Sequence, residues 1–139
     1  MDELPLFGKT YTKSYLKDCN ILSLSFVGDA IHTFYIRDRV FSISPYKNNE
    51  LHKDASSFCK AEAQAKLTEK LYEMLDEDEI FIYKKAKHSR VNSIPKNCDA
   101  YTYHLATAFE AVIGYIYLLG NQNRVLELLN ALYIDDKNN

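Results

Sequence analysis

Turn-forming residues are scarce along this chain, which has 4 glycines and 3 prolines among 139 residues. An all-β sandwich or barrel needs a turn signal at intervals of about 8–12 residues, so this scarcity counts against that class of fold. The apolar residues instead recur at helical spacing in several long segments. The sequence therefore predicts an all-α fold, an irregular bundle of about five or six helices.

Capping residues and apolar spacing give the predicted organisation. Residues 1–17 show no helical period, so we expect an irregular N-terminal arm there. Residues 18–134 are expected to form a single domain and residues 135–139 a solvated tail. The predicted helices cover residues 18 or 20 to about 41, 51–57, 60–75, 76 onward, 99–119 and 122–133. Segment 89–98 lacks any period and is predicted to be a long loop. In the first helix, an apolar stripe is expected to face the core: Leu24, Val27, Ile31 and Phe34.

Charge and cysteine content limit the function classes. The net charge is −2 and the pI about 6.1, whereas strongly basic nucleic-acid-binding domains have a pI above ~9, so any such binding must come from a local patch. The three cysteines, Cys19, Cys59 and Cys98, form no CxxC pair, so neither a disulfide framework nor a zinc knuckle is indicated, and free thiols fit a reducing cytoplasm. The N-terminus lacks a signal-peptide pattern, and no apolar stretch approaches the ~20 residues that cross a bilayer. We expect a cytoplasmic protein without a membrane partner.

Two predicted helices carry a glycine in their interior with a carboxylate close by. Asp29 follows Gly28, and Glu110 precedes Gly114 by one turn. A mid-helix glycine costs ~1 kcal/mol relative to alanine, and its usual reason is the close approach of another backbone or a ligand. If the two helices meet there, the two carboxylates share a partly desolvated cleft and repel each other. A divalent cation would resolve this, and carboxylate oxygens suit Mg²⁺ or Mn²⁺, which can activate water against a phosphodiester.

The simpler alternative is that Asp29 and Glu110 pair with basic side chains such as Arg37 or Arg39. Spacing alone favours this alternative. His32 lies one turn after Asp29 and is either a metal ligand or, as is more common on a helix face, a packing or surface residue.

A run of basic side chains without any acidic residue lies between Tyr83 and Asn97. Its members are Lys84, Lys85, Lys87, Arg90 and Lys96. In a chain with a net negative charge, this run is a concentrated positive patch suited to phosphate contacts. The alternative is a solvated helix end, where cations complement the helix dipole. The sequence favours the two interpretations about equally.

Three segments resemble a known family. Phe-Val-Gly-Asp-Ala at residues 26–30 resembles the ribonuclease III signature, in which a glycine–aspartate pair sits in a buried helix. Thr-Ala-Phe-Glu-Ala-Val-Ile-Gly at residues 107–114 resembles the second catalytic helix of that family. Pro-Lys-Asn-Cys-Asp at residues 95–99, followed by Tyr103, looks like the compact branch called Mini-ribonuclease III. The resemblance covers about residues 19–133.

The resemblance implies a homodimeric, Mg²⁺-dependent endoribonuclease with the all-α fold of the ribonuclease III catalytic domain, acting on double-stranded RNA. The catalytic aspartate falls on Asp29 and the metal-binding glutamate on Glu110, with Mn²⁺ as a substitute metal. For the compact branch, the implied role is maturation of precursor large-subunit (23S) ribosomal RNA, so a ribosomal protein or an assembling ribosomal subunit is an implied partner. The alternative is a non-catalytic RNA- or ribosome-binding module on the same fold.

The chain departs from ordinary ribonuclease III at two positions. Ser25 and Thr107 stand where that enzyme has acids, and the compact branch shares this loss. With Asn97, they are candidates for supporting the two carboxylates. Too few residues follow Gly120 for the double-stranded-RNA-binding domain of the family. We therefore expect the catalytic domain itself to bind RNA, which gives the basic residues of segment 84–96 a role.

Overall fold

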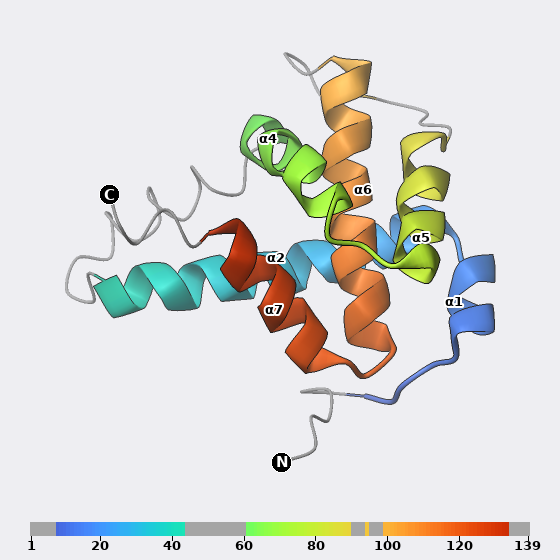
Figure 1. Cartoon of the computed structure of the whole chain (residues 1–139), viewed down its shortest axis with the longest axis horizontal. Coiled ribbons are helices and arrows are strands. Elements are labelled where there is room, and N and C mark those ends of the chain that lie inside the picture. The colour runs from blue at the N-terminus through green and yellow to red at the C-terminus, as the bar shows by residue number, and fades with distance from the viewer. Residues whose placement is uncertain (1–7, 44–60, 90–93, 95–98, 134–139) are drawn as a thin grey trace.

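The computed structural model describes residues 8–43, 61–89, 94 and 99–133, and every regular element among them is a helix (Figure 1). The helices are α1 Lys13–Asp18, α2 Ile21–Ile43, α4 Ala61–Tyr72, α5 Glu77–Lys87, α6 Ala100–Leu118 and α7 Gln122–Leu132. The all-α prediction is confirmed. The predicted helix at 51–57, most of the predicted loop at 89–98 and the C-terminal tail lie outside the described residues.

Helix α6 forms the centre of the bundle, and α2, α4 and α5 pack around it (Figure 1). Between Leu105 and Tyr117, every residue of α6 is buried except Glu110, which is half-buried. A helix that is apolar on all sides belongs in the interior, so α6 is the natural core helix of this chain. Glu110 is the one acidic residue that this core helix carries.

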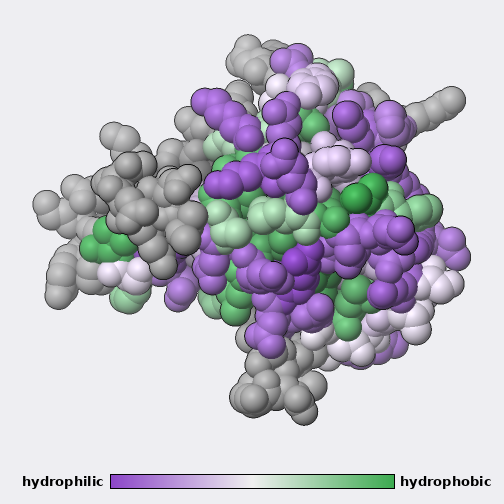
Figure 2. Space-filling model, viewed as in Figure 1, coloured by the Kyte–Doolittle hydropathy of each residue, from purple (hydrophilic) through white to green (hydrophobic). Residues whose placement is uncertain are grey.

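Polar side chains cover most of the face shown in Figure 2, with apolar side chains visible between the helices. Among the described helices, none combines the length and the apolar character needed to cross a membrane.

Local capping signals fix several helix ends as the sequence predicts. Asp76 and Glu79 form a capping box at the start of α5, with each side chain accepting from the backbone N–H of the other at 2.8 and 2.9 Å. Asp99 accepts from the N–H of Thr102 at 2.7 Å and starts α6. Gly120 follows α6 with φ of +88°, a left-handed conformation that favours glycine.

The prediction of an irregular arm over residues 1–17 is wrong for its last part, where α1 forms. Thr12 caps this short helix, since its hydroxyl accepts from the N–H of Tyr15. Leu16 is buried in the core, and the Lys85 ammonium donates to the carbonyls of Lys17 and Cys19 at 2.7 and 2.9 Å. One buried leucine in a six-residue helix leaves no period to detect, and the Lys85 contacts are long-range.

The predicted apolar stripe of α2 is also partly wrong. Leu24 is buried, but Phe34 is 60% exposed. The buried face runs instead through Gly28, His32 and Ile36, each one turn after the last. A hydropathy pattern misses this face because a glycine and a histidine occupy two of its positions.

Candidate active site

Helices α2 and α6 cross with their backbones in contact at two glycines. A Cβ atom on Gly28 would overlap the carbonyl of Glu110 and lie 2.8 Å from the amide nitrogen of Gly114. A Cβ atom on Gly114 would overlap the carbonyl of Leu24 and lie 2.9 Å from the nitrogen of Gly28. The contact is reciprocal, so neither position has room for a larger residue. The close approach that the sequence predicts at these glycines is confirmed.

This crossing brings the two predicted carboxylates together. Asp29 follows the α2 contact glycine and is exposed, while Glu110 lies at the α6 contact and is half-buried. A side-chain hydrogen bond joins them. Burial, and next the negative charge of Asp29, raise the pKa of the Glu110 carboxyl to about 8. In the metal-free protein the pair therefore holds a proton near neutral pH.

The alternative of a simple ion pair is not what the described residues show. No Lys or Arg side chain among them forms an ion pair with Asp29 or Glu110. Arg39 donates instead to the Tyr35 hydroxyl at 3.1 Å and to the Tyr133 carbonyl at 2.7 Å. The negative charge of the pair is thus left without a compensating cation from this part of the chain.

Two neutral side chains donate to the Glu110 carboxylate. The Ser25 hydroxyl donates to Oε1 at 2.9 Å, and the Gln64 amide donates to Oε2 at 3.4 Å. Ser25 is 8% and Gln64 2% exposed, so these contacts lie inside the protein. Donors to the ionised form lower the pKa and oppose the effect of burial. Ser25 is thereby placed beside Glu110, as expected for a supporting residue.

Gln64 is a site residue that the sequence reasoning missed. Gln64, Thr68 and Leu71 lie one turn apart on α4, and all three are buried. Polar residues in register with a core leucine are the signal that could have identified this inward face. Of the other two supporting candidates, Thr107 is buried one turn before Glu110, and Asn97 lies outside the described residues.

His32 is a buried packing residue. Its ring makes an edge contact with Phe109 at a centroid distance of 4.9 Å. Nε2 lies 2.7 Å from the Tyr133 hydroxyl, and Nδ1 lies 3.3 Å from Nε2 of Gln64. Burial lowers the pKa of His32 to about 4, although the negative charge of Asp29 opposes the shift. His32 is therefore neutral at physiological pH.

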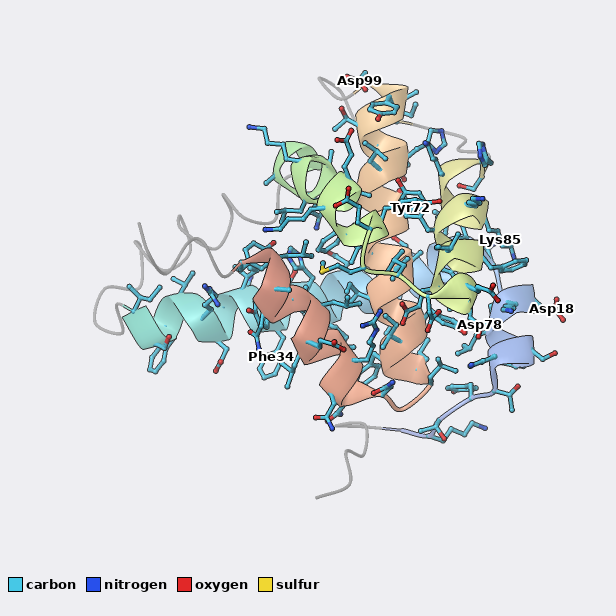
Figure 3. All side chains as sticks on the ribbon, viewed as in Figure 1. Asp18, Phe34, Tyr72, Asp78, Lys85 and Asp99 are labelled. Atoms are coloured by element: carbon cyan, nitrogen blue, oxygen red, sulfur yellow. The ribbon has the colours of Figure 1, made fainter. Side chains whose placement is uncertain are left out.

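Three of the five predicted basic residues lie on α5, which contacts α1: Lys84, Lys85 and Lys87. Lys84 is exposed and Lys87 half-buried, whereas the Lys85 ammonium is used inside the fold by its two carbonyl contacts beside α1 (Figure 3). Arg90 and Lys96 lie outside the described residues.

The donor set at Asp29 and Glu110 fits a hard divalent cation. Two carboxyl groups share a proton there, and a cation in that place would relieve their repulsion. The described residues contain no cluster of three or more His, Cys, Asp or Glu side chains able to hold a metal. Two protein carboxylates plus water are typical of Mg²⁺, which usually keeps several of its waters.

Comparison with known proteins identifies the family of this chain. The Ribonuclease III domain model matches residues 22–121. Mini-ribonuclease 3 of Enterococcus faecalis is 40% identical over 116 residues, which cover 82% of this chain and 88% of the relative. Mini-ribonuclease 3 of Clostridium tetani is 37% identical, over 90% of this chain and 83% of the relative. The crystal structure of a Fusobacterium nucleatum protein superposes with a TM-score of 0.76 at 34% identity, over 84% of this chain and 89% of that one. The chain therefore belongs to the ribonuclease III family, in its Mini-ribonuclease 3 group, and is an endoribonuclease.

Proposed function

We propose that this chain is a Mg²⁺-dependent endoribonuclease that cleaves double-stranded RNA, with Asp29 and Glu110 as its catalytic and metal-binding carboxylates. The observation that carries the proposal is their pairing at the glycine crossing of α2 and α6 without a basic partner among the described residues. Two helix-interior glycines are costly, and they allow an approach that places these two acids together. A non-catalytic module on the same fold would gain nothing from this arrangement.

The two carboxylates have different surroundings and therefore different tasks. Asp29 is exposed, and we assign it to the side that meets the incoming phosphodiester. Glu110 is held from behind by Ser25 and Gln64, so its oxygens are fixed before RNA arrives. A bound Mg²⁺ would lower the pKa of a coordinated water and stabilise the negative charge that develops on the phosphate. Mn²⁺ has the same preference for oxygen ligands and is the expected substitute.

RNA contacts outside the active site are assigned to the basic end of α5 and the segment after it. Cationic side chains there would attract the phosphates of the RNA backbone electrostatically. We assign this role to Lys84 and Lys87 on α5 and, on sequence grounds, to Arg90 and Lys96. Lys85 is the exception, since its ammonium already holds the end of α1.

Cleavage of both strands of a duplex needs two copies of the site, and a two-fold homodimer supplies them. Helix α2 offers an apolar surface for such contact, with Phe26 80% and Phe34 60% exposed. Phe34, labelled in Figure 3, also lines an apolar groove of about 230 Å³, to which Leu126 of α7 contributes. Solvent-exposed aromatic rings of this kind are common at protein interfaces.

We propose maturation of precursor 23S ribosomal RNA as the cellular role, because segments 26–30, 95–99 and 107–114 resemble the compact ribonuclease III branch. The substrate would then be a duplex within that precursor, met in the cytoplasm on an assembling ribosomal subunit, with a ribosomal protein as a partner in its presentation.

The test is incubation of the purified protein with an RNA duplex and, separately, with each of its single strands, in Mg²⁺ and in EDTA. We expect the duplex to be cleaved in Mg²⁺, and we expect no cleavage of the single strands and none in EDTA. Binding of the duplex without cleavage in either Mg²⁺ or Mn²⁺ would favour the non-catalytic alternative.

A further inference from the structure

The Gln64 amide occupies a buried position between two functional groups. It lies 3.3 Å from Nδ1 of His32 on α2 and 3.4 Å from Oε2 of Glu110 on α6, both measured from its Nε2 nitrogen. Gln64 is 2% exposed and His32 fully buried. The amide of α4 thus closes a hydrogen-bond chain from Tyr133 through His32 to Glu110.

The hydrogen-bonding chemistry of these groups determines which end of the Gln64 amide faces Glu110. An amide NH₂ group carries two hydrogens, enough for both His32 Nδ1 and Glu110 Oε2. When Glu110 is ionised to hold a cation, the reversed amide would place its carbonyl oxygen against a carboxylate oxygen, with no hydrogen between them. The matching tautomer of neutral His32 carries its hydrogen on Nε2, gives it to the Tyr133 hydroxyl and keeps Nδ1 as an acceptor for the amide.

The backbone that carries Gln64 is itself held in place. The Thr68 hydroxyl donates to the Gln64 carbonyl at 2.7 Å and contacts the Leu105 carbonyl of α6 at 3.3 Å. Thr68 is fully buried, so this contact ties α4 to α6 one turn away from the amide. The Gln64 side chain therefore reaches Glu110 from a fixed base.

We propose that Gln64 is a positioning residue for the metal site: its amide, oriented by His32, holds Oε2 of Glu110 so that the carboxylate is set beside Asp29 for a divalent cation. This inference rests on the proposed function, because it assigns Glu110 to the metal. Groups that hold a metal-binding carboxylate from behind typically change metal affinity about 10- to 100-fold when they are removed. Ser25 holds the other oxygen, so loss of Gln64 frees one side of the carboxylate and leaves the other fixed.

The test is a titration of the Gln64→Met variant with Mn²⁺ in the absence of RNA, in which electron paramagnetic resonance measures the concentration of free Mn²⁺. Methionine has a similar length and no donor. We expect the Mn²⁺ dissociation constant to rise about 10- to 100-fold. In cleavage assays, the Mg²⁺ concentration for half-maximal rate should rise by a similar factor, while the rate at saturating Mg²⁺ stays close to that of the wild type.

Leu67→Ala is the matched control, since it removes core packing from the same helix and keeps Gln64, His32 and Thr68. It should lower thermal stability and leave the Mn²⁺ affinity unchanged. His32→Phe is a second variant that keeps Gln64 but removes the group that orients it, and it should weaken Mn²⁺ binding in the same direction. If Gln64→Met does not fold, His32→Phe carries the test.

The two ways to fail are distinguishable. If the wild type binds Mn²⁺ and cleaves duplex RNA, while Gln64→Met and His32→Phe bind Mn²⁺ as tightly as the wild type, the positioning role is overturned and the proposed function stands. A wild type that neither binds Mn²⁺ nor cleaves RNA overturns the proposed function itself, and the positioning role with it.

Discussion

At the scale of single residues, Glu110 is the group whose surroundings say most about the site. It lies on the core helix, is held by two neutral donors, and shares a hydrogen bond with another acid. Burial and the negative charge of Asp29 raise its pKa from 4.5 to about 8. Ionisation of a buried carboxyl group beside a second acid costs free energy unless a cation is bound there.

This state predicts a pH effect on stability in the metal-free protein. Between pH 4.5 and about 8 the folded state binds more protons at Glu110 than the unfolded chain does, so stability falls as the pH rises through that window. His32, with a pKa lowered from 6.5 to about 4, acts in the opposite direction but only below pH 6.5. From pH 6.5 to 8.5 in EDTA, the wild type should therefore lose about 2 kcal/mol relative to Glu110→Gln.

Thermal unfolding of the two proteins across this pH range measures the effect, because groups common to both cancel in the difference. The melting temperature of Glu110→Gln should exceed that of the wild type by a margin that grows with pH. A margin that is constant from pH 6.5 to 8.5 would mean that Glu110 ionises normally in the folded protein.

At the scale of elements, the crossing of α2 and α6 depends on its two glycines. Helix propensity alone predicts that Gly28→Ala stabilises the protein by ~1 kcal/mol. The overlap of a Cβ with the Glu110 carbonyl predicts the opposite, because a backbone atom cannot move aside cheaply. We expect a loss of about 3 kcal/mol, at the upper end of overpacking effects, in urea-induced unfolding.

Ser23→Ala is the control for this experiment. Ser23 is exposed on the same helix, so its replacement reports propensity without overlap. If Gly28→Ala were as stable as the wild type or more stable, the two backbones would not be in contact.

Helix α5 is the element assigned to phosphate contact. Replacing Lys84 and Lys87 together by alanine should weaken RNA binding and flatten the dependence of log affinity on log salt, by roughly one for each lysine that binds a phosphate in the wild type. Fluorescence anisotropy with labelled duplex RNA from about 50 to 200 mM salt measures the slope.

Lys66→Ala provides a comparison, since Lys66 is exposed on α4 instead. A slope for the Lys84→Ala, Lys87→Ala variant equal to those of Lys66→Ala and the wild type would move the RNA path away from α5.

The helices also show which features of the fold and the site can be predicted from the sequence alone. Local signals fixed the starts of α5 and α6 at Asp76 and Asp99, and the interior glycines marked the backbone contact that joins the two acids. The spacing of Gln64, Thr68 and Leu71 marks an inward face of α4, but no local signal identifies Glu110, 46 positions away, as the partner of Gln64. Helix α1 likewise depends on α5, through the contacts of Lys85.

At the scale of the whole molecule, one subunit carries one carboxylate pair, which in the proposed function attacks one strand. Paired cuts with a fixed stagger, leaving short 3′ overhangs, require a second copy related by a two-fold axis. Light scattering at micromolar concentration should therefore give a mass of about twice 16.1 kDa. Phe26→Asp should shift the mass toward that of the monomer, because it places a charge on the most exposed aromatic side chain of α2.

Phe81→Asp is the comparison, since Phe81 is 46% exposed on α5 and lies over the Lys17 ammonium instead. A wild type that is monomeric at this concentration and still makes paired cuts would contradict the dimeric mechanism.

The central claim is that Asp29 and Glu110 form the catalytic pair, and the most direct measurement is the rate of duplex RNA cleavage by Asp29→Asn in saturating Mg²⁺. The substitution keeps the shape of the side chain and removes the charge that a metal needs. We expect the rate to fall at least about 1,000-fold, with thermal stability equal to or above that of the wild type because the repulsion within the pair is relieved. Asp38→Asn, at an exposed position on the same helix, should keep its activity. Turnover by Asp29→Asn close to the wild-type value would contradict the account.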